Sequence, residues 1–461
     1  MLIRKSKLKT TMLIEFRVSN YRSIGEEQVL SLVPAPKQKE HPQNIIENET
    51  YNRGKYKALN AVAIYGANAS GKSNLLKAMK LIDRIISLSF QAVSTQKLPY
   101  EPFLLRDGWS EKPTSYEITF SIDKNRYRYG FEFNQSEIIS EWLFKKSKSR
   151  ERELFQRSGD NIDVSSALKG SVKVIDAAIE ATRPNALFLS TCDAFNIEEA
   201  KNILKWFQNY IVIDGLNTQK EAIKTVRLFE DETYQQKIKD YFIELNLGIV
   251  DLDITSRDFE VSELEEEIPE ELRSALISTL TGTKRYTVFS THNKYDKQGN
   301  KTSNLLTWKL GEKESEGTQK AFHLSGAILW TLINGGVLII DEIEASMHPK
   351  MTLHTINMFL DKEVNINNAQ LVFATHDTNL LSYAALRRDQ ICFSEKNQWE
   401  STEFYSLSDF VYFKGNGDIS GIQKERPDTD KEKRYFEGRY GAIPILGDFN
   451  PIRGKQNGAK D

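Results

Sequence analysis

Residues 63–79 read AIYGANASGKSNLLKAM and carry two glycines, a lysine and a serine at the spacing G-x-x-x-x-G-K-S. This spacing is typical of a phosphate-binding loop. Glycines let backbone N–H groups face phosphate oxygens, and a helix that begins near Lys72 adds its positive end. The predicted loop consists of Gly66, Ala67, Asn68, Ala69, Ser70, Gly71, Lys72, Ser73 and Asn74.

The flanks of the loop support this interpretation. An apolar run at 61–65 precedes it and suits a buried strand. Apolar residues follow at helical spacing, namely Leu75, Met79, Ile82 and Ile86. Strand, glycine-rich loop and helix is the order that a phosphate loop requires. We therefore expect Lys72 to reach the β- and γ-phosphates and Ser73 to bind Mg²⁺.

Three polar residues follow two later apolar runs. VLIIDE places Asp341 and Glu342 at the end of a predicted strand, and ATHD places His376 after the next one. A carboxylate at this point can hold a Mg²⁺ shell, which we assign to Asp341. Its neighbour Glu342 can orient or deprotonate the attacking water. His376 is predicted to hydrogen-bond the γ-phosphate or that water.

The segment ESEGTQK, residues 314–320, predicts a second anion-binding element. It combines the Ser315 hydroxyl, flexible backbone at Gly317 and a helix that begins near Thr318. The alternative is a solvent-facing loop that only caps this helix. The segment follows the phosphate loop by about 240 residues, so one chain need not bring the two together.

The chain alternates between α/β and other patterns. Residues 12–35 suggest two strands with a turn near Gly25, and 114–146 suggest antiparallel sheet with a turn at Asp123. The acidic run at 263–272 is expected to be a solvated helix end or loop, and 423–434 a mobile linker. The predicted parts are 1–146, one half of a phosphate-binding α/β core with an antiparallel β subdomain; 147–302, a mainly helical insertion outside that core, where we expect oligomer or partner contacts; 303–412, the other half of the core; and 413–461, a tail.

Composition narrows the class of protein. The chain has 461 residues, 27% of them charged, and a formal net charge of −2, so a globally basic nucleic-acid-binding surface is not expected. Its 2 cysteines are too few for a disulfide framework and suit a reducing cytoplasm. No apolar run approaches a membrane span, and the basic start lacks the apolar core of a signal peptide. Because the strand pattern begins at Met12, residues 1–11 are expected to be a short extension.

The order of these motifs resembles the ABC-type ATPases of the structural-maintenance and RecF group. That resemblance implies an α/β fold, an ABC-type head with a mixed sheet and flanking helices. It also implies that ATP is held between two head-to-tail subunits. The Ser-x-Gly-x-Gln signature, here Ser315, Gly317 and Gln319, would then close over the ATP of a partner subunit. The signature departs from the transporter form LSGGQ, which points away from transporters.

A closer resemblance covers nearly the whole chain from Met12 and is to the AAA15/AAA21 class, which is related to the OLD family. It rests on YGANASGKSNLLKAM, EGTQK, IIDEIEASMHPKM, FATHDTNLL and EGRYGAIPILGDF. It implies Lys72 and Ser73 for phosphate and Mg²⁺, Asp341 for Mg²⁺, Glu342 as catalytic base and His376 as switch histidine. It also puts 346–351 in the loop that communicates across the dimer, Phe103 near the place of a glutamine-bearing loop, and Asn20 and Arg22 near the base.

Three hypotheses follow. In the first, the chain is an ATPase subunit of anti-phage defence, like those encoded beside an RloB-type partner, and it controls a separate effector. The stretch after His376 is shorter than a Toprim nuclease domain, so the effector would be an RloB-like or a Toprim or nuclease protein. DNA or a phage protein would be the trigger, and the subunit would form a homodimer or higher oligomer. The second hypothesis is a RecF-like DNA-repair clamp, and the third a scaffold that turns over ATP rarely.

Overall fold

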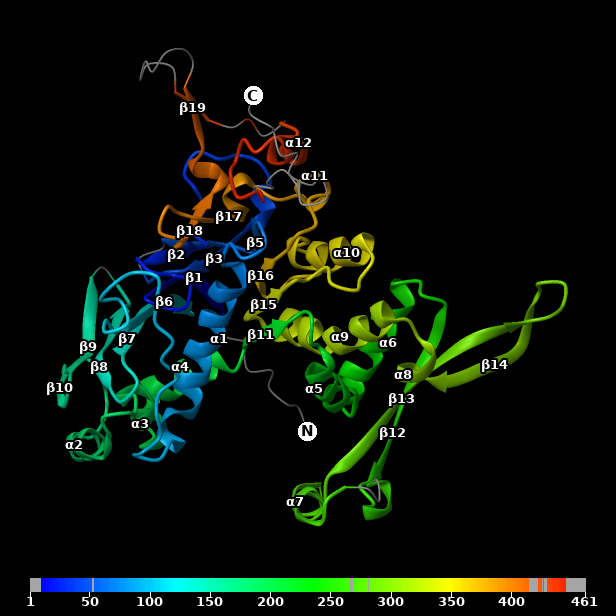
Figure 1. The fold of residues 1–461 in the computed structure, drawn as a ribbon, viewed down its shortest axis with the longest axis horizontal. Helices are drawn as coiled ribbons and strands as arrows, with labels where there is room; N and C mark the ends of the chain where they lie inside the picture. The colour runs from blue at the N-terminus through cyan, green and yellow to red at the C-terminus, as the bar shows by residue number, and fades with distance from the viewer. Residues whose placement is uncertain are drawn as a thin grey trace, which may run out of the picture.

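The computed structural model describes residues 10–51, 54–148, 150–264, 268–280, 282–413, 422–424, 426 and 429–444. The chain forms two main sheets with helices around them, and a slender β arm leaves this body (Figure 1). Residues 1–9 lie outside the described part, and the first strand begins at Thr11, one residue before the predicted start.

The first sheet has seven antiparallel strands in the order β10-β9-β8-β7-β6-β1-β2. The predicted strand pair in 12–35 and the antiparallel sheet in 114–146 are both confirmed. Asp123 turns the chain between β6 and β7 with φ 51°, a conformation that Asp tolerates better than most residues. The strands are β1 Thr11–Ser19, β2 Gln28–Ser31, β6 Thr114–Ile122, β7 Asn125–Phe133, β8 Ile138–Lys146, β9 Glu151–Ser158 and β10 Asn161–Val164.

The central sheet has the order β11-β15-β16-β5-β17-β18, in which only β17 and β18 pair antiparallel. The predicted buried strands before the phosphate loop, before Glu342 and before His376 are confirmed. Because the first five strands of this order are parallel, the loops after β5, β11, β15 and β16 meet at one edge. The strands are β5 Ala61–Gly66, β11 Tyr210–Asp214, β15 Val337–Asp341, β16 Gln370–Ala374, β17 Ile391–Lys396 and β18 Thr402–Ser406.

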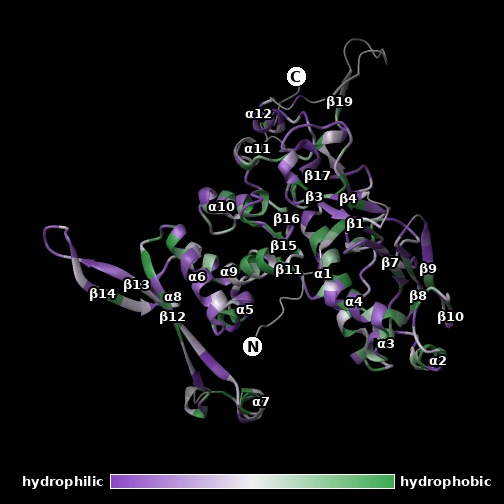
Figure 2. Ribbon diagram, turned by 180° about the vertical axis from the view of Figure 1, so that it is seen from behind, coloured by the Kyte–Doolittle hydropathy of each residue, from purple (hydrophilic) through white to green (hydrophobic). Residues whose placement is uncertain are grey.

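Helices cover both faces of the central sheet. The side chains of β5 alternate between these two faces. Val62 and Ile64 join the hydrophobic core that contains the buried side of α1 Lys72–Leu88. Ala63 and Tyr65 point the other way, into the core that contains α9 Glu316–Asn334 and α10 Pro349–Leu360. Hydrophobic residues are prominent in α1 and α9, whereas much of the arm is hydrophilic (Figure 2). The predicted mixed sheet with flanking helices is therefore confirmed.

Residues 147–302 contain more helix than strand, yet they do not form a segment apart from the core. The predicted boundary at 147 falls inside the first sheet, which continues through β9 and β10. The short run that forms β11 joins the central sheet beside β15. A five-residue apolar run between helices has no period that distinguishes a strand from a helix segment. The helices are α2 Val172–Ala181, α3 Phe188–Ala194, α4 Glu198–Phe207, α5 Gln219–Phe229, α6 Glu232–Glu244 and α7 Glu270–Leu280.

The arm is a three-stranded antiparallel sheet, β12-β13-β14. Figure 1 shows the β13–β14 hairpin extending from the body in one direction and the β12–β13 end, with α7 beside it, in another. The acidic run at 263–272 belongs to this end; residues 265–267 lie outside the described part, and α7 begins at Glu270. The strands are β12 Ile249–Asp258, β13 Lys284–Tyr295 and β14 Lys301–Lys309, and α8 Leu310–Lys313 follows.

The C-terminal part packs on the central sheet. The prediction of a mobile linker at 423–434 is wrong for its last residues, which begin α12 Lys431–Phe436; residues 425, 427 and 428 lie outside the described part. Aromatic contacts hold α12 in place, because the buried Tyr435 stacks on Phe393 and meets Tyr65 of β5 edge-on. The hydroxyl of Thr378, in the loop after β16, also donates to Glu432 at 3.2 Å.

The remaining elements are short. They are β3 Ile45–Glu49, β4 Lys55–Leu59, β19 Val411–Phe413, β20 Ile422–Lys424, α11 Leu380–Tyr383, and the 3₁₀ helices Pro42–Asn44, Ser89–Gln91, Val261–Glu263, Arg388–Gln390 and Leu407–Asp409.

Candidate nucleotide site

The phosphate loop lies between β5 and α1, and its contacts with β17 and β18 explain its glycines. A Cβ on Gly66 would lie 2.4 Å from the backbone oxygen of Ser394, and one on Gly71 would lie 2.1 Å from Thr402 Oγ1. Gly71 also has φ 110°, which side-chain-bearing residues rarely adopt. The hydroxyls of Ser394 and Thr402 donate to the Ser70 carbonyl at 3.0 and 2.9 Å. Contacts with β17 and β18 therefore hold the loop in its conformation.

A series of hydrogen bonds between polar side chains also fixes the first turn of α1. Asn74 Nδ2 donates to Ser23 Oγ at 2.7 Å, and Ser23 Oγ lies 2.8 Å from Thr402 Oγ1. Asn68 and Ala69 are exposed at the tip of the loop, and Ala69 has φ 63°. Sequence reasoning missed Ser23, because a lone serine carries no motif and only the fold brings it here.

Lys72 lies buried under the loop. Its ammonium donates to the Gly66 carbonyl at 2.8 Å and to the Ala67 carbonyl at 3.1 Å. Burial lowers the pKa of Lys72 to about 8, although the negative charges of Asp341, Glu342 and Glu344 act to raise it. A bound phosphate would supply a nearby negative charge and stabilise the charged lysine.

Asp341, at the carboxyl end of β15, faces the start of α1. The Ser73 hydroxyl favours the charged form of this carboxylate, but the pKa of Asp341 is raised, chiefly by burial and further by Asp214. Asp341 Oδ1 is buried, and it makes no hydrogen bond to any described side chain or backbone group. Such an oxygen beside a serine hydroxyl fits a Mg²⁺ ion, which takes one or two carboxylates along with phosphate oxygens and water. The described residues contain no group of three metal-binding side chains, and Mg²⁺ bound in this way requires none.

Glu342 follows in a constrained turn. It has φ 48°, and Ser346 a few residues later has φ 56°. Each left-handed residue costs about 1–2 kcal/mol, so the surroundings must hold the turn. Asp214, at the end of β11, pairs in register with Asp341, and the next N–H, that of Gly215, donates to the Asp341 carbonyl at 2.8 Å. A Cβ on Gly215 would lie 2.2 Å from that oxygen.

Asp214 therefore brings a further carboxylate to the edge of the sheet where the loops meet. Sequence reasoning missed it, although an acid directly after an apolar run is the signal that identified Asp341. Phe103, which the resemblance placed near a glutamine-bearing loop, is buried against Trp109. Asn20 is engaged with backbone, since its amide donates to the Lys112 carbonyl at 2.6 Å, and Arg22 pairs with Glu101.

His376 follows β16, and Glu344 connects it with the turn after β15. The backbone N–H of His376 donates to Glu344 Oε1 at 2.6 Å. The pKa of His376 is lowered, first by burial and then by Lys72, which favours the neutral imidazole. The structure thus brings Lys72, Asp341, Glu342 and His376 to one edge of the sheet. It also adds Glu344, whose Oε2 is buried without a hydrogen bond to a described residue.

The predicted signature lies at the start of α9. Ser315 is the N-cap of this helix and its Oγ accepts the Thr318 N–H at 3.2 Å, so the predicted helix start is confirmed to within two residues. Gln319 Nε2 donates to the Glu314 carbonyl at 3.0 Å. A Cβ on Gly317 would lie 2.7 Å from the Ser346 carbonyl. Ser315 is exposed, and its hydrogen bonds to described residues stay within this segment.

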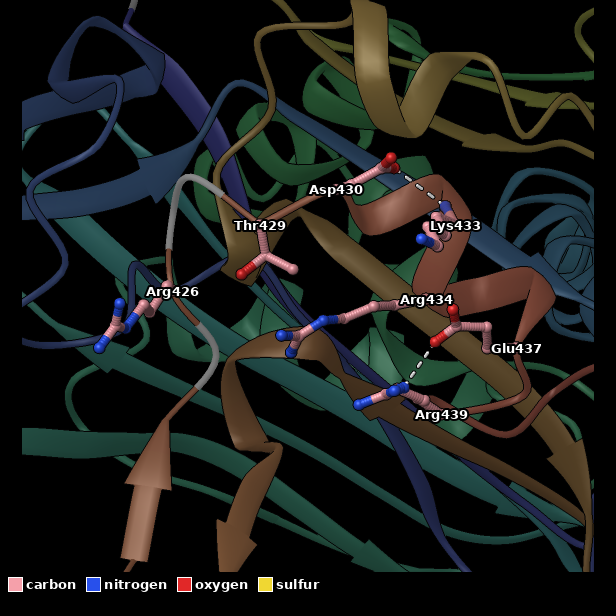
Figure 3. A pocket seen from close by; sticks show the side chains of 7 residues that line it. All are labelled: Arg426, Thr429, Asp430, Lys433, Arg434, Glu437 and Arg439. Atoms are coloured by element: carbon pink, nitrogen blue, oxygen red, sulfur yellow. Dashed lines mark hydrogen bonds and ion pairs between the residues drawn. The ribbon is translucent and has the colours of Figure 1, made fainter.

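A separate pocket lies beside α12 and contains none of the predicted nucleotide residues (Figure 3). Its acids are already engaged, because Glu437 pairs with Arg439 at 2.7 Å and Asp430 accepts the Lys433 N–H at 3.0 Å. Its lining consists of Arg426, Thr429, Asp430, Lys433, Arg434, Glu437 and Arg439.

Comparison with known proteins gives a match to a protein family. The model of the family described as "AAA domain, putative AbiEii toxin, Type IV TA system" matches residues 61–382, from β5 to α11. No curated protein matches the chain. None of the described helices is long and apolar enough to cross a bilayer.

Several solved structures are similar over most of their length. An SMC head bound to the C-winged helix domain of ScpA is 12% identical, with a TM-score of 0.37, and the match covers 86% of this chain and 97% of that one. The SMC head domain from Thermotoga maritima is 11% identical, with a TM-score of 0.36 and coverage of 86% and 98%. The recombination mediator protein RecF with ATPrS is 13% identical, with a TM-score of 0.35 and coverage of 86% and 99%.

Proposed function

Because this chain belongs to the family described as "AAA domain, putative AbiEii toxin, Type IV TA system", we propose that it is an ABC-type ATPase working in anti-phage defence. In this proposal ATP and Mg²⁺ bind between two head-to-tail subunits in the cytoplasm. Binding and hydrolysis then control a separately encoded effector.

One observation carries the proposal for the site. The buried Asp341 Oδ1 makes no hydrogen bond to any described residue, although the Ser73 hydroxyl and the Lys72 ammonium lie at the same edge of the sheet. An unpaired buried acceptor is costly unless something completes it. Ser73 and Asp341 would hold Mg²⁺, which neutralises charge on the phosphates when bound. Lys72 and the loop N–H groups would bind the phosphates, Glu342 would orient the attacking water, and the neutral His376 would hydrogen-bond it or the γ-phosphate.

The signature supports a site completed by a second subunit. Ser315 is exposed at the N-terminus of a long helix, where hydroxyl and backbone N–H groups suit an anion. A head-to-tail dimer would place Ser315, Gly317 and Gln319 of one subunit over the phosphates held by the other.

The assay that tests the ATPase compares wild type with K72A and E342Q. K72A is expected to lose nucleotide binding, while E342Q keeps ATP binding and loses turnover by about a hundredfold. Steady-state phosphate release and binding of a fluorescent ATP analogue measure the two properties separately. Normal hydrolysis by K72A contradicts the site assignment.

Control of an effector rests on the family description, which names a toxin–antitoxin setting. The effector would be an RloB-like or a Toprim or nuclease protein, and DNA or a phage protein would be the trigger. Co-purification of the neighbouring gene product with E342Q in ATP, and its absence with K72A, is the expected result. Phage plating with each variant then checks the defence role, and equal protection by wild type and K72A contradicts it.

The tip of the arm favours a second candidate, a RecF-like clamp on DNA. Lys294, Lys297 and Lys301 are all exposed at the β13–β14 hairpin, where they could contact phosphates. A clamp predicts ATP-dependent binding to duplex ends that weakens steeply with salt. Substitution of the three lysines by glutamine would then flatten the salt dependence. Salt-independent or undetectable binding favours control of an effector.

A further inference from the structure

Lys320 is a buried lysine whose ammonium donates to backbone carbonyls in the turn after β15. It lies on α9, with 4% of its surface exposed. Its Nζ donates to the carbonyls of Ala345, Glu342 and Ile343 at 2.7, 3.3 and 3.3 Å. A lysine ammonium has three N–H donors, so each has one carbonyl partner.

The carbonyls belong to the strained turn that carries the proposed catalytic base. Glu342 has φ 48° at one end of the turn and Ser346 has φ 56° at the other. A non-glycine residue keeps such a conformation only where its surroundings determine it. Lys320 hydrogen-bonds to three carbonyls within this turn, and the first of them along the chain is that of Glu342 itself.

The turn also touches the signature helix at a second point. Gly317 packs so closely on the turn that a Cβ would come within 2.7 Å of the Ser346 carbonyl. Lys320 and Gly317 lie one helical turn apart, on the same face of α9. Two contacts therefore connect the first turns of α9 to the turn that carries Glu342. Ser315 lies at the start of these helical turns.

From this geometry we infer that Lys320 is a positioning residue that holds the backbone of Glu342 and ties it to the helix that begins at Ser315. The inference rests on the proposed ATPase function. In a head-to-tail dimer, the signature of a subunit faces one ATP and its Glu342 faces the other. Lys320 would then transmit closure at one site to the carboxylate of the second.

The charge of Lys320 fits this role without direct contact to nucleotide. Burial lowers its pKa to about 8, while Glu344, Glu342 and Asp214 oppose the shift. An apolar side chain of similar length could fill the space but could not hold carbonyls. The three hydrogen bonds of this buried ammonium therefore point to a role in the shape of the turn rather than in filling the core.

The test compares K320M, which keeps the length of the side chain and removes its donors, with wild type. We expect kcat to fall between about ten- and a hundredfold, because a small misplacement of a catalytic group has this effect. The Kd for a fluorescent ATP analogue is expected to stay within about twofold of wild type, because Lys320 does not touch the phosphate loop. The control is K396M, which removes an ammonium bound to the Glu400 carbonyl away from the turn and is expected to leave kcat unchanged.

A second-site change distinguishes positioning from a general structural role. Glycine adopts φ 56° without strain. The double variant K320M/S346G is therefore expected to have a kcat at least about threefold higher than that of K320M. S346A keeps the strain and is expected to restore none of the lost kcat. Absence of rescue by S346G, or a parallel loss of ATP affinity in K320M, overturns the inference.

The remaining outcomes are also decisive. If K320M does not fold by circular dichroism, K320Q decides, because its amide keeps two donors and is expected to give an intermediate kcat. Wild-type kcat in either variant overturns the inference, while hydrolysis by wild type still supports the proposed ATPase. Absence of hydrolysis by wild type instead contradicts the proposed function itself.

Discussion

At the residue scale, glycines in the phosphate loop are required by space as well as by backbone conformation, and Gly71 shows both. We expect G71A to destabilise the protein by about 2–4 kcal/mol, since overpacking against Thr402 adds to the strain of φ 110°. Nucleotide binding is expected to be lost as the loop shifts. Urea unfolding and binding of a fluorescent ATP analogue measure the two effects.

Gly108 provides the matched control. It has φ 77°, and a Cβ there would meet no atom within 4 Å. G108A is therefore expected to cost about 1 kcal/mol from strain alone and to leave binding intact. Equal effects of the two substitutions would show that the contact with Thr402 is unimportant.

The lowered pKa of Lys72 predicts how ATP affinity depends on pH. Because this pKa is about 8 in the free protein and phosphate favours the charged lysine, binding takes up a proton above that pH. The Kd for ATP is expected to rise by up to about tenfold per pH unit above pH 8 and to be flat near pH 7. Calorimetry in buffers of different ionisation enthalpy detects the proton directly.

Lys320 also titrates near pH 8, so it needs a control. K320M is expected to keep the pH dependence of binding, because its ammonium does not contact the phosphate loop. Proton uptake on ATP binding that disappears in K320M would contradict the assignment to Lys72.

At the scale of elements, a buried acid joins α3 to the first sheet. Glu141 of β8 is 0% exposed and accepts hydrogen bonds from Tyr129 Oη and from the N–H groups of Phe188 and Leu189 at the start of α3. E141A leaves these donors unpaired, and we expect a loss of about 3–5 kcal/mol in the free energy of unfolding. E137A, at an exposed position, is expected to change it by less than about 0.5 kcal/mol. A small effect of E141A in urea unfolding would show that α3 is held by packing alone.

The sequence identifies elements where local pattern and chemistry agree. The phosphate loop, β15 with its acids and the start of α9 each combine a periodic apolar run with residues that bind anions or cations. The strand β11 and its Asp214 were missed, because five apolar residues between helices have no distinguishing period. Lys320 and Glu344 were missed for another reason: their partners are backbone groups brought close only by the fold. No local pattern specifies such contacts.

At the scale of the whole molecule, the exposed Ser315 and the phosphate loop predict a shared site, and mixed subunits can test it. S315D keeps the N-cap, because Asp caps as well as Ser, but places a negative charge where the phosphate would bind. K72A disables the phosphate loop of its own subunit. In a head-to-tail dimer of one K72A and one S315D subunit, both defects fall in one site, and the other site is built from two intact halves.

Neither variant alone is expected to hydrolyse ATP, because each of its dimers carries a defect in both sites. An equimolar mixture is expected to recover about one quarter of the wild-type rate, since half of the dimers are mixed and each has one intact site. Phosphate release after mixing, and its dependence on protein concentration, measures this recovery. The control mixes K72A with the K72A/S315D double variant, in which every phosphate loop is defective, and it is expected to stay inactive. If S315D hydrolyses ATP normally by itself, Ser315 does not face a phosphate, and the head-to-tail arrangement proposed for this ATPase is wrong.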